Sequence, residues 1–178
     1  MKMKMTWLLL AAASLLASCK ETPASSTETP TPAPSEALTR VLTAAPSGKP
    51  QAIHTIRDSA QAGDEITVSG RIMGNLKPFV DGRAAFILGD PEILIPCNER
   101  PDDDCETPWD NCCDSPEDKK RATATIQIVD ADGRVLKEAI EGLGGLEKLA
   151  HVTVSGKVAE GSSPDLLLIN AQAIRSSN

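Results

Sequence analysis

Four of the five cysteines in this chain lie within one short stretch, at Cys97, Cys105, Cys112 and Cys113. An even number of thiols in an oxidising compartment predicts disulfide bonds. Adjacent cysteines rarely bond each other, because the peptide between them must distort. Two pairings therefore stay open: Cys97 with Cys112 and Cys105 with Cys113, or Cys97 with Cys113 and Cys105 with Cys112.

A second hypothesis is that the same four cysteines form a thiolate metal site, with zinc or copper(I) as the candidate ions. The spacing holds no Cys-x-x-Cys pair, and an oxidising compartment works against reduced thiols, so we rank this below the disulfides. A redox-active thiol pair comes third, because no flanking helix that would lower a thiol pKa is visible. We expect no bound cofactor and no metal under the leading hypothesis.

Acidic residues crowd the same stretch and raise the question of a calcium site, since hard cations bind several carboxylate oxygens. Their spacing does not match the EF-hand loop. A solvated acidic loop is the preferred interpretation of this group, which comprises Asp102, Asp103, Asp104, Glu106, Asp110 and Asp114.

Catalytic patterns are absent from the sequence. His54 falls in a short amphipathic segment and His151 at a strand start, and both read as surface or capping residues. Ser69 and Ser155 occur in a Val-Ser-Gly strand pattern, not in a Gly-x-Ser-x-Gly elbow. No phosphate loop or dinucleotide fingerprint is present, so we predict that the protein is not an enzyme.

The fifth cysteine, Cys19, ends a Leu-Ala-Ser-Cys motif that follows Lys2, Lys4 and an apolar run over residues 6–16. That run is too short to span a bilayer, for which ~20 apolar residues are needed. The pattern is typical of a lipoprotein signal, so residues 1–18 are predicted to be cleaved and Cys19 to carry a lipid anchor. An aspartate after the lipidated cysteine would retain a lipoprotein in the inner membrane, and Lys20 stands there instead. We therefore expect the protein in the outer membrane, facing the periplasm or the surface.

Composition narrows the binding functions. The formal charge is −7 and aromatic residues make up 2% of the chain, so neither clustered cations nor stacking platforms support nucleic-acid binding. Residues 19–50 are rich in Pro, Ser and Thr and are predicted to be a disordered tether. The folded domain is expected to cover residues 51–178.

The sequence pattern of this domain predicts an all-β fold with one or two short helices. Strands are predicted at residues 65–73, 84–88, 122–129, 151–158 and 166–174, with helices near 52–60 and 143–149. Gly70 and Gly156 lie inside two nearly identical strands and suggest sharp bends, as at a barrel corner. This element order is that of the five-stranded OB-fold, with the Cys-rich loop between the second and third strands. The expected core is Ile66, Val68, Phe86, Ile126, Ile128, Val152, Val154 and Leu168.

A candidate ligand face follows from that fold, because OB-folds bind ligands on one face and its rim. The residues placed there are Arg71, Lys77, Arg83, Trp109, Lys119, Lys120 and Arg121. Six cations in an acidic protein could recognise an anionic glycan or another polyanion. They could also be solvated charges that balance the acidic loop, and this second reading is preferred.

Residues 63–72, 78–80 and 84–86, followed by Cys-Glu-Thr-Pro-Trp-Asp-Asn-Cys-Cys at 105–113, resemble a group of uncharacterised exported bacterial proteins common in planctomycetes. Those proteins carry a Pro-Trp-Asp-x-Cys-Cys signature in an OB-like domain, and tyrosine is frequent at the position of Asn111. The resemblance implies a fold and a compartment but no activity. The leading hypothesis is a lipid-anchored envelope protein with a non-catalytic binding or scaffolding domain whose partner is an envelope protein or an anionic glycan. The alternative is a metal-handling envelope protein that uses the four cysteines.

Overall fold

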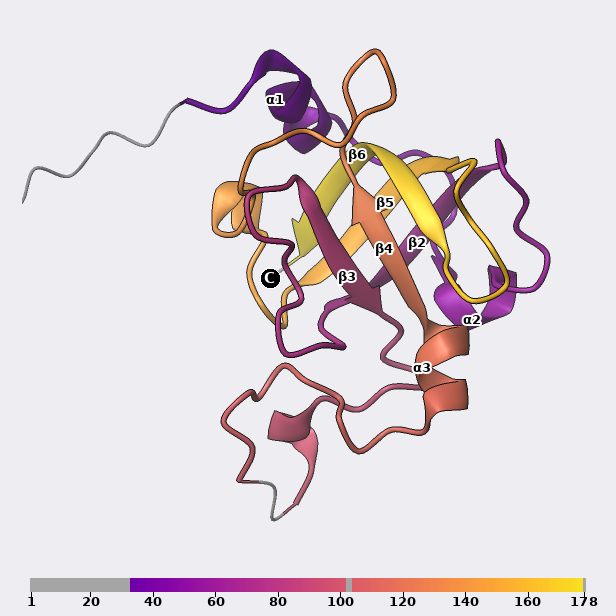
Figure 1. Ribbon diagram of the computed structural model, residues 1–178, viewed down its shortest axis with the longest axis vertical. Coiled ribbons are helices and arrows are strands. Elements are labelled where there is room, and N and C mark those ends of the chain that lie inside the picture. Colours follow the sequence, from indigo (N-terminus) through magenta and orange to yellow (C-terminus); the bar gives the residue numbers. More distant parts are fainter. Residues whose placement is uncertain (1–32, 102–103, 178) are drawn as a thin grey trace, which may run out of the picture. The chain divides into compact units, whose positions relative to one another are not determined.

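A closed five-stranded β-barrel forms the folded unit in the computed structural model, which describes residues 33–101 and 104–177. The barrel strands are β2 (Glu65–Ile72), β3 (Ala85–Gly89), β4 (Thr123–Gln127), β5 (His151–Val158) and β6 (Leu168–Ser177). Their order around the barrel is β2-β3-β4-β6-β5, and β5 pairs with β2 to close it (Figure 1). Only β4 and β6 run parallel within this ring. The predicted OB-like barrel is confirmed.

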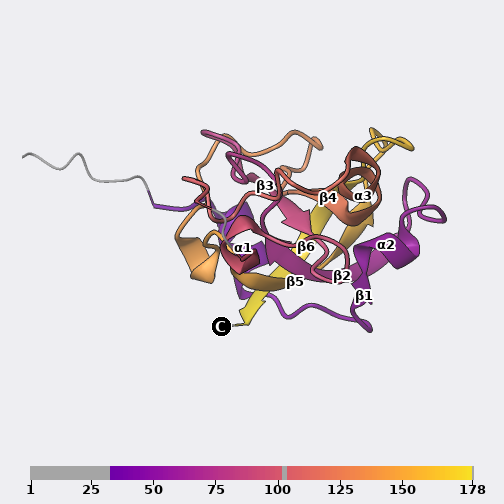
Figure 2. The same ribbon diagram turned by 90° about the horizontal axis from the view of Figure 1, so that it is seen from below.

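Within the described ranges, one further strand and three short helices surround the barrel. The two-residue strand β1 (Gln51–Ala52) pairs parallel with β2 and leads directly into α2 (Ile53–Ile56). The helix predicted over 52–60 is thus a single turn. The helix α3 (Pro116–Ala122), which the sequence analysis did not predict, contacts α2, and the two lie toward one side in the view from below (Figure 2). Two 3₁₀ turns, Cys97–Glu99 and Leu143–Gly145, complete the elements.

Both mid-strand glycines lie where two backbones approach too closely for a side chain. A Cβ atom at Gly70 would sit 2.6 Å from the carbonyl oxygen of Gly89, and one at Gly156 would sit 2.3 Å from that of Asn170. At Gly156 the β5–β6 register also shifts, because Ser155 faces Ala173 while Gly156 faces Ala171. This bulge is the bend that the sequence predicted at Gly156.

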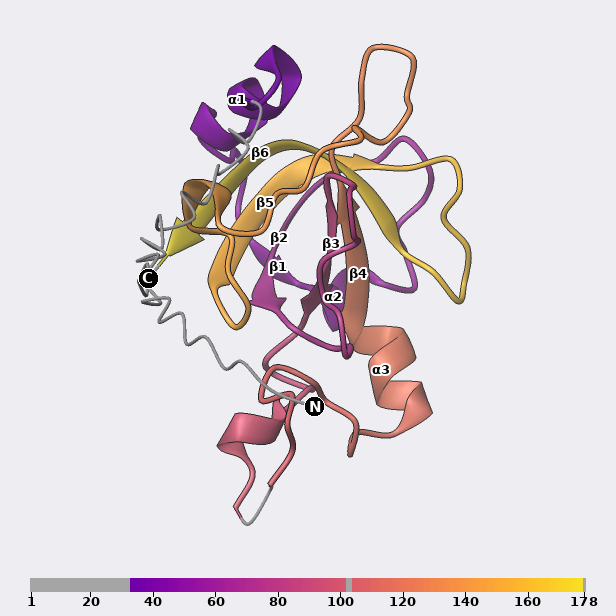
Figure 3. The same cartoon turned by 60° about the vertical axis from the view of Figure 1, so that its left-hand side comes forward.

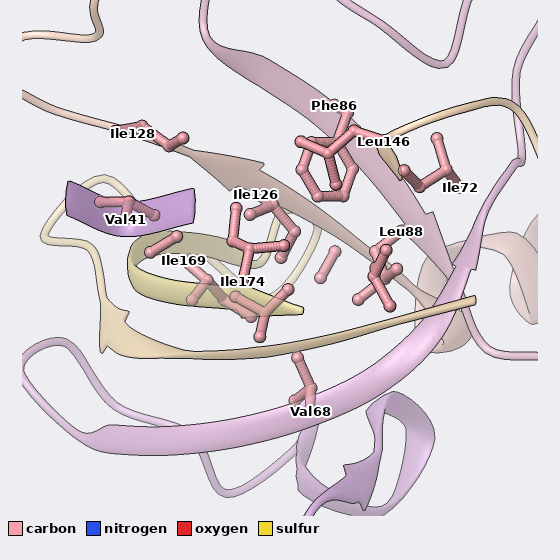
Figure 4. Close-up of a cluster of buried hydrophobic side chains, with 14 of the residues drawn as sticks. Val41, Val68, Ile72, Phe86, Leu88, Ile126, Ile128, Leu146, Ile169 and Ile174 are labelled. Atoms are coloured by element: carbon pink, nitrogen blue, oxygen red, sulfur yellow. The ribbon is translucent and has the colours of Figure 1, made fainter. Parts of the chain in front are cut away.

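The folded unit begins before residue 51, so the prediction of a disordered tether up to residue 50 is wrong for its last part. Helix α1 (Glu36–Thr43) starts at Ser35, whose side chain accepts a hydrogen bond from the Leu38 amide. Leu38 and Val41 are buried in the main core against β6, and Figure 4 shows Val41 in the same cluster as Ile169. Apolar residues at helical spacing therefore give this segment enough buried surface to order it. Residues 19–32 lie outside the described residues.

The barrel core contains most of the side chains expected there (Figure 4). Val68, Phe86, Ile126, Ile128, Val152 and Val154 are all buried. Ile66 is partly buried and packs against the cluster, whereas Leu168 is partly buried and does not belong to it; Leu167 and Ile169 on either side are buried core residues. The prediction for Leu168 is therefore wrong by one position, since the run of apolar residues at 166–169 carries no alternation that would set its facing.

The elements at the two ends of the barrel differ. In Figures 1 and 3 the loop between β3 and α3 extends below the barrel, whereas α1 and the loop after β4 lie near its upper end. No helix in the described ranges is both long and apolar enough to cross a bilayer.

Candidate functional site

The loop over residues 90–115, hereafter the cysteine loop, joins β3 to α3 and carries all four clustered cysteines. Its two arms pair through their backbones: the Cys97 amide donates to the Asp110 carbonyl at 2.8 Å and the Asn98 amide to the Pro108 carbonyl at 3.0 Å. This pairing brings Cys97, on the first arm, next to the residues that precede Cys112 on the second. The loop therefore has a defined shape near its base.

Side chains close the base of the cysteine loop as well. The carboxylate of Asp114 accepts the Ile95 amide at 3.1 Å and forms an ion pair with Arg100. Arg100 also donates to the Ile95 carbonyl at 3.3 Å. One carboxylate and one guanidinium thus connect the start and the end of the loop, and both are largely shielded from solvent.

Trp109 attaches the cysteine loop to the loop between β2 and β3. Its indole Nε1 donates to the Leu76 carbonyl at 3.0 Å, and its own carbonyl accepts the Gly74 amide at 3.2 Å. The ammonium of Lys148 lies 4.2 Å from the centre of the ring, a cation–π distance. Trp109, one of the residues predicted on the ligand face, is therefore engaged in holding the loop.

The sulfur atoms converge inside this framework. Cys97 Sγ lies 3.6 Å from Cys112 Sγ, and Cys112 Sγ lies 3.7 Å from Cys113 Sγ. The Sγ atoms of Cys97, Cys105 and Cys112 all lie within 4.8 Å of one another. A disulfide bond is ~2.05 Å long, so the Cys97–Cys112 distance is one of contact and not of a bond. Cys97 is buried, Cys105 is half-buried, and Cys112 and Cys113 are exposed.

Crowding of the thiols affects the acidity of Cys112. Its hydrogen bond with Cys97 lowers the pKa, but the hydrogen bond with Cys113, partial desolvation and repulsion by Cys113 and Cys105 together raise the pKa above its ordinary value. Neighbouring negative charges make each further thiolate harder to form. Cys112 is therefore harder to ionise than an ordinary thiol when no cation is present.

The acidic residues of the loop do not gather around a common point within the described part of the chain. Asp114 pairs with Arg100, the side chain of Asp110 accepts the Asn111 amide at 2.7 Å, and Asp104 and Glu106 are exposed. Asp102 and Asp103 lie outside the described residues. Among the described residues, the cysteine trio is the one group close enough to share an ion, and no carboxylate belongs to it.

Two other predicted ligand-face residues also support the cysteine loop. Arg71 forms an ion pair with Glu99 in the loop and donates to the Leu149 carbonyl at 3.2 Å, and its side chain is only 11% exposed. Lys119, in the last turn of α3, donates to the Cys112 carbonyl at 3.1 Å. Both cations are held by protein groups, which supports a structural role.

The structure spreads the remaining predicted cations over separate places. Lys77 pairs with Asp81 and lines a small hollow beside Phe79. Lys120 pairs with Asp165 and lines another, beside Arg57, while Arg121 pairs with Asp118 on α3. Arg83 is the one predicted cation that lines the larger groove described next.

A groove of about 710 Å³ lies over the outer surface of β3 and β4, at the end of these strands away from the cysteine loop. Ala85, Thr125 and Gln127 form its strand side, and Asp130 and residues 134–137, which follow β4, form the opposite wall. The Leu136 amide donates to the Ile128 carbonyl at 3.0 Å and the Ala84 amide to the Leu136 carbonyl at 2.9 Å, so this wall is fixed to the barrel.

Cations outnumber carboxylates in the groove, which holds Arg83, Arg134 and Lys137 beside Asp130. Arg134 pairs with Asp130 and Asp132, whereas Arg83 and Lys137 are exposed and form no ion pair within the described residues. Hydrogen bonds from the backbone and the side chain of Arg134 lower the pKa of Asp130, so this carboxylate keeps its negative charge beside the guanidinium. Sequence analysis missed Arg134 and Lys137, because only the returning loop brings them beside Arg83.

His54 has a structural partner. Its Nδ1 lies 2.7 Å from Oδ2 of Asp90, and its backbone amide donates to the same oxygen at 3.0 Å. Asp90 is 1% exposed and also accepts the Glu92 amide at 3.0 Å. The pair connects α2 to the first residue of the cysteine loop, whereas His151 is exposed at the start of β5.

Comparison with known proteins yields no relative for this chain. No family model matches it, and neither the curated proteins nor the solved structures contain a significant match. The resemblance to exported planctomycete-type proteins stays a prediction.

Proposed function

We propose that this protein is a lipid-anchored envelope protein whose OB-like barrel is a non-catalytic binding module for an anionic glycan. The observation that supports this most directly is the groove over β3 and β4. These are the second and third strands of the barrel, the face on which OB-folds bind oligosaccharides and oligonucleotides. The groove therefore lies where this architecture places its ligands.

Charge and lining favour an acidic sugar polymer over a nucleic acid. Arg83 and Lys137 present cations to the groove, and Thr125 and Gln127, which also line it, add hydrogen-bonding groups. None of the residues that line the groove is aromatic, so it offers no platform on which bases stack. Carboxylated sugars need cations and hydrogen bonds, and this groove supplies both.

The binding test uses an oligomer of galacturonic acid, with a neutral galactose oligomer of the same length as the control ligand. Calorimetry should detect binding of the acidic oligomer alone, and the affinity should fall as salt is raised. Arg83→Ala and Lys137→Ala should each weaken binding by about twofold to fivefold, the equivalent of one screened charge contact. Lys77→Ala is the matched control, because Lys77 lines a different hollow. Equal affinity for both oligomers would contradict the proposal.

The anchor has an independent test. Radiolabelled palmitate should enter the wild-type protein but not the Cys19→Ser variant, which should accumulate as an unlipidated precursor. Label in the variant would contradict the predicted anchor while leaving the groove proposal unaffected.

A further inference from the structure

The cysteine trio lies at the opposite end of the β3–β4 pair from the groove. At that end Gly89 pairs with Thr123: Gly89 is the last residue before the cysteine loop, and Thr123 is the first residue after α3. Ala85 pairs with Gln127 at the groove end. The two sites share neither residues nor a lining element. Glycan binding therefore does not explain why thiols gather in the loop.

We propose that Cys97, Cys105 and Cys112 form a binding site for one soft, thiophilic metal ion, Cu⁺ or Zn²⁺. Three sulfurs from three separate points of the loop lie within 4.8 Å of one another. With metal–sulfur bonds of ~2.3 Å, the corners of a tetrahedral site are ~3.8 Å apart. The Cys97–Cys112 distance of 3.6 Å is close to that spacing and exceeds a disulfide bond by more than an ångström.

The framework of the loop holds two of these ligands in place before any ion arrives. Cys97 is held by the hydrogen bond that its backbone amide donates to the Asp110 carbonyl, and Cys112 by the hydrogen bond that the Lys119 ammonium donates to its carbonyl. The Arg100–Asp114 pair closes the loop around them. Preorganised ligands pay little ordering entropy on binding, which strengthens a small site.

The donor set selects the kind of metal. All three ligand atoms are sulfur, and soft thiolates select Cu⁺, Zn²⁺ or iron–sulfur clusters over Ca²⁺ and Mg²⁺. Each coordinating thiol releases its proton to solvent and donates an electron pair to the ion, with no change of oxidation state. Exposure of Cys112 gives the ion a path into the site, while burial of Cys97 shields one side.

The test uses the full chain, purified in detergent under anaerobic and reducing conditions and titrated separately with Cu⁺ and Zn²⁺ against chromogenic chelators. One ion should bind per chain, and the ion that binds more tightly in the two titrations identifies the metal. Cys112→Ser should lower the affinity at least ~100-fold, since even loss of an outer partner of a ligand costs 10–100-fold. Cys105→Ser is the second variant, chosen because Cys97 is buried and its replacement could impair folding.

Cys113→Ser is the matched control, because Cys113 is adjacent in sequence and its Sγ contacts Cys112 but does not belong to the trio. Its affinity should stay within about threefold of wild type, a change of under ~1 kcal/mol. A loss as large as that of Cys112→Ser would overturn the three-ligand assignment. The proposal is also overturned if neither ion binds, or if protein isolated from the envelope without reductant carries a Cys97–Cys112 disulfide and no metal.

Discussion

The indole Nε1 of Trp109 donates a hydrogen bond to the carbonyl oxygen of Leu76 and thereby fastens the cysteine loop to the loop between β2 and β3. Trp109→Phe keeps an aromatic ring near Lys148 but removes this donor, so we expect a loss of about 1 kcal/mol in the free energy of unfolding. Trp109→Ala also removes the half-buried ring and should cost about 2 kcal/mol. Urea denaturation measures both changes.

Lys148→Ala is the control for the ring contact. It removes the cation from the face of the indole and leaves the hydrogen bond to Leu76, so the loss should stay below about 1 kcal/mol. Wild-type stability in Trp109→Ala would show that the cysteine loop is not fastened to the barrel through this residue.

Docking of α1 gives the second prediction. Leu38 is fully buried in the main core, so Leu38→Ala should lower the free energy of unfolding by about 2–5 kcal/mol. Arg40→Ala, on the exposed side of the same helix, removes only a solvent-exposed pair with Glu36 and should change stability by less than about 0.5 kcal/mol. Thermal unfolding of both variants distinguishes a docked helix from a tether, for which the two changes would be alike.

Sequence patterns predicted the barrel because its strands alternate between buried and exposed residues. Val68, Ile126 and Val154 stand at alternating positions in their strands, and all three are buried. The pattern fails at residues 166–169, four apolar residues in a row, where the parallel pairing of Ile126 with Ile169 decides which side chains face inward. That pairing joins distant parts of the chain and leaves no local signal.

Helix α1 did have a local signal, which its proline-rich surroundings obscured. Ser35 is a good N-cap, and Leu38, Val41 and Leu42 follow at helical spacing. The two candidate sites differ in how far the sequence predicts them. Clustering of the cysteines was evident from their spacing in the sequence. The groove requires Lys137 to lie beside Arg83, which only the tertiary structure establishes.

Gly156 carries the third prediction. A Cβ atom there would lie 2.3 Å from the carbonyl oxygen of Asn170 and 3.0 Å from the Cα of Ala171, and neither backbone group can move without breaking the β5–β6 pairing. Gly156→Ala should therefore cost about 2–3 kcal/mol. At Gly161 a Cβ atom would meet only the end of the Leu168 side chain, at 3.3 Å. Gly161→Ala is the control, and its effect should stay within about 0.5 kcal/mol; equal losses would contradict the close approach at the bulge.

Asn111 carries the fourth prediction. The residue is fully buried, and neither its side-chain oxygen nor its nitrogen has a hydrogen-bond partner among the described residues. A buried amide without partners costs about 1–3 kcal/mol, and leucine has a similar shape without that cost. Asn111→Leu should therefore raise the free energy of unfolding by about 1 kcal/mol, measured by urea denaturation.

Asn98→Leu, at an exposed position on the other arm of the same loop, is the control and should change stability by less than about 0.5 kcal/mol. A destabilised Asn111→Leu variant would show instead that the amide binds a group that leucine cannot replace, such as a buried water.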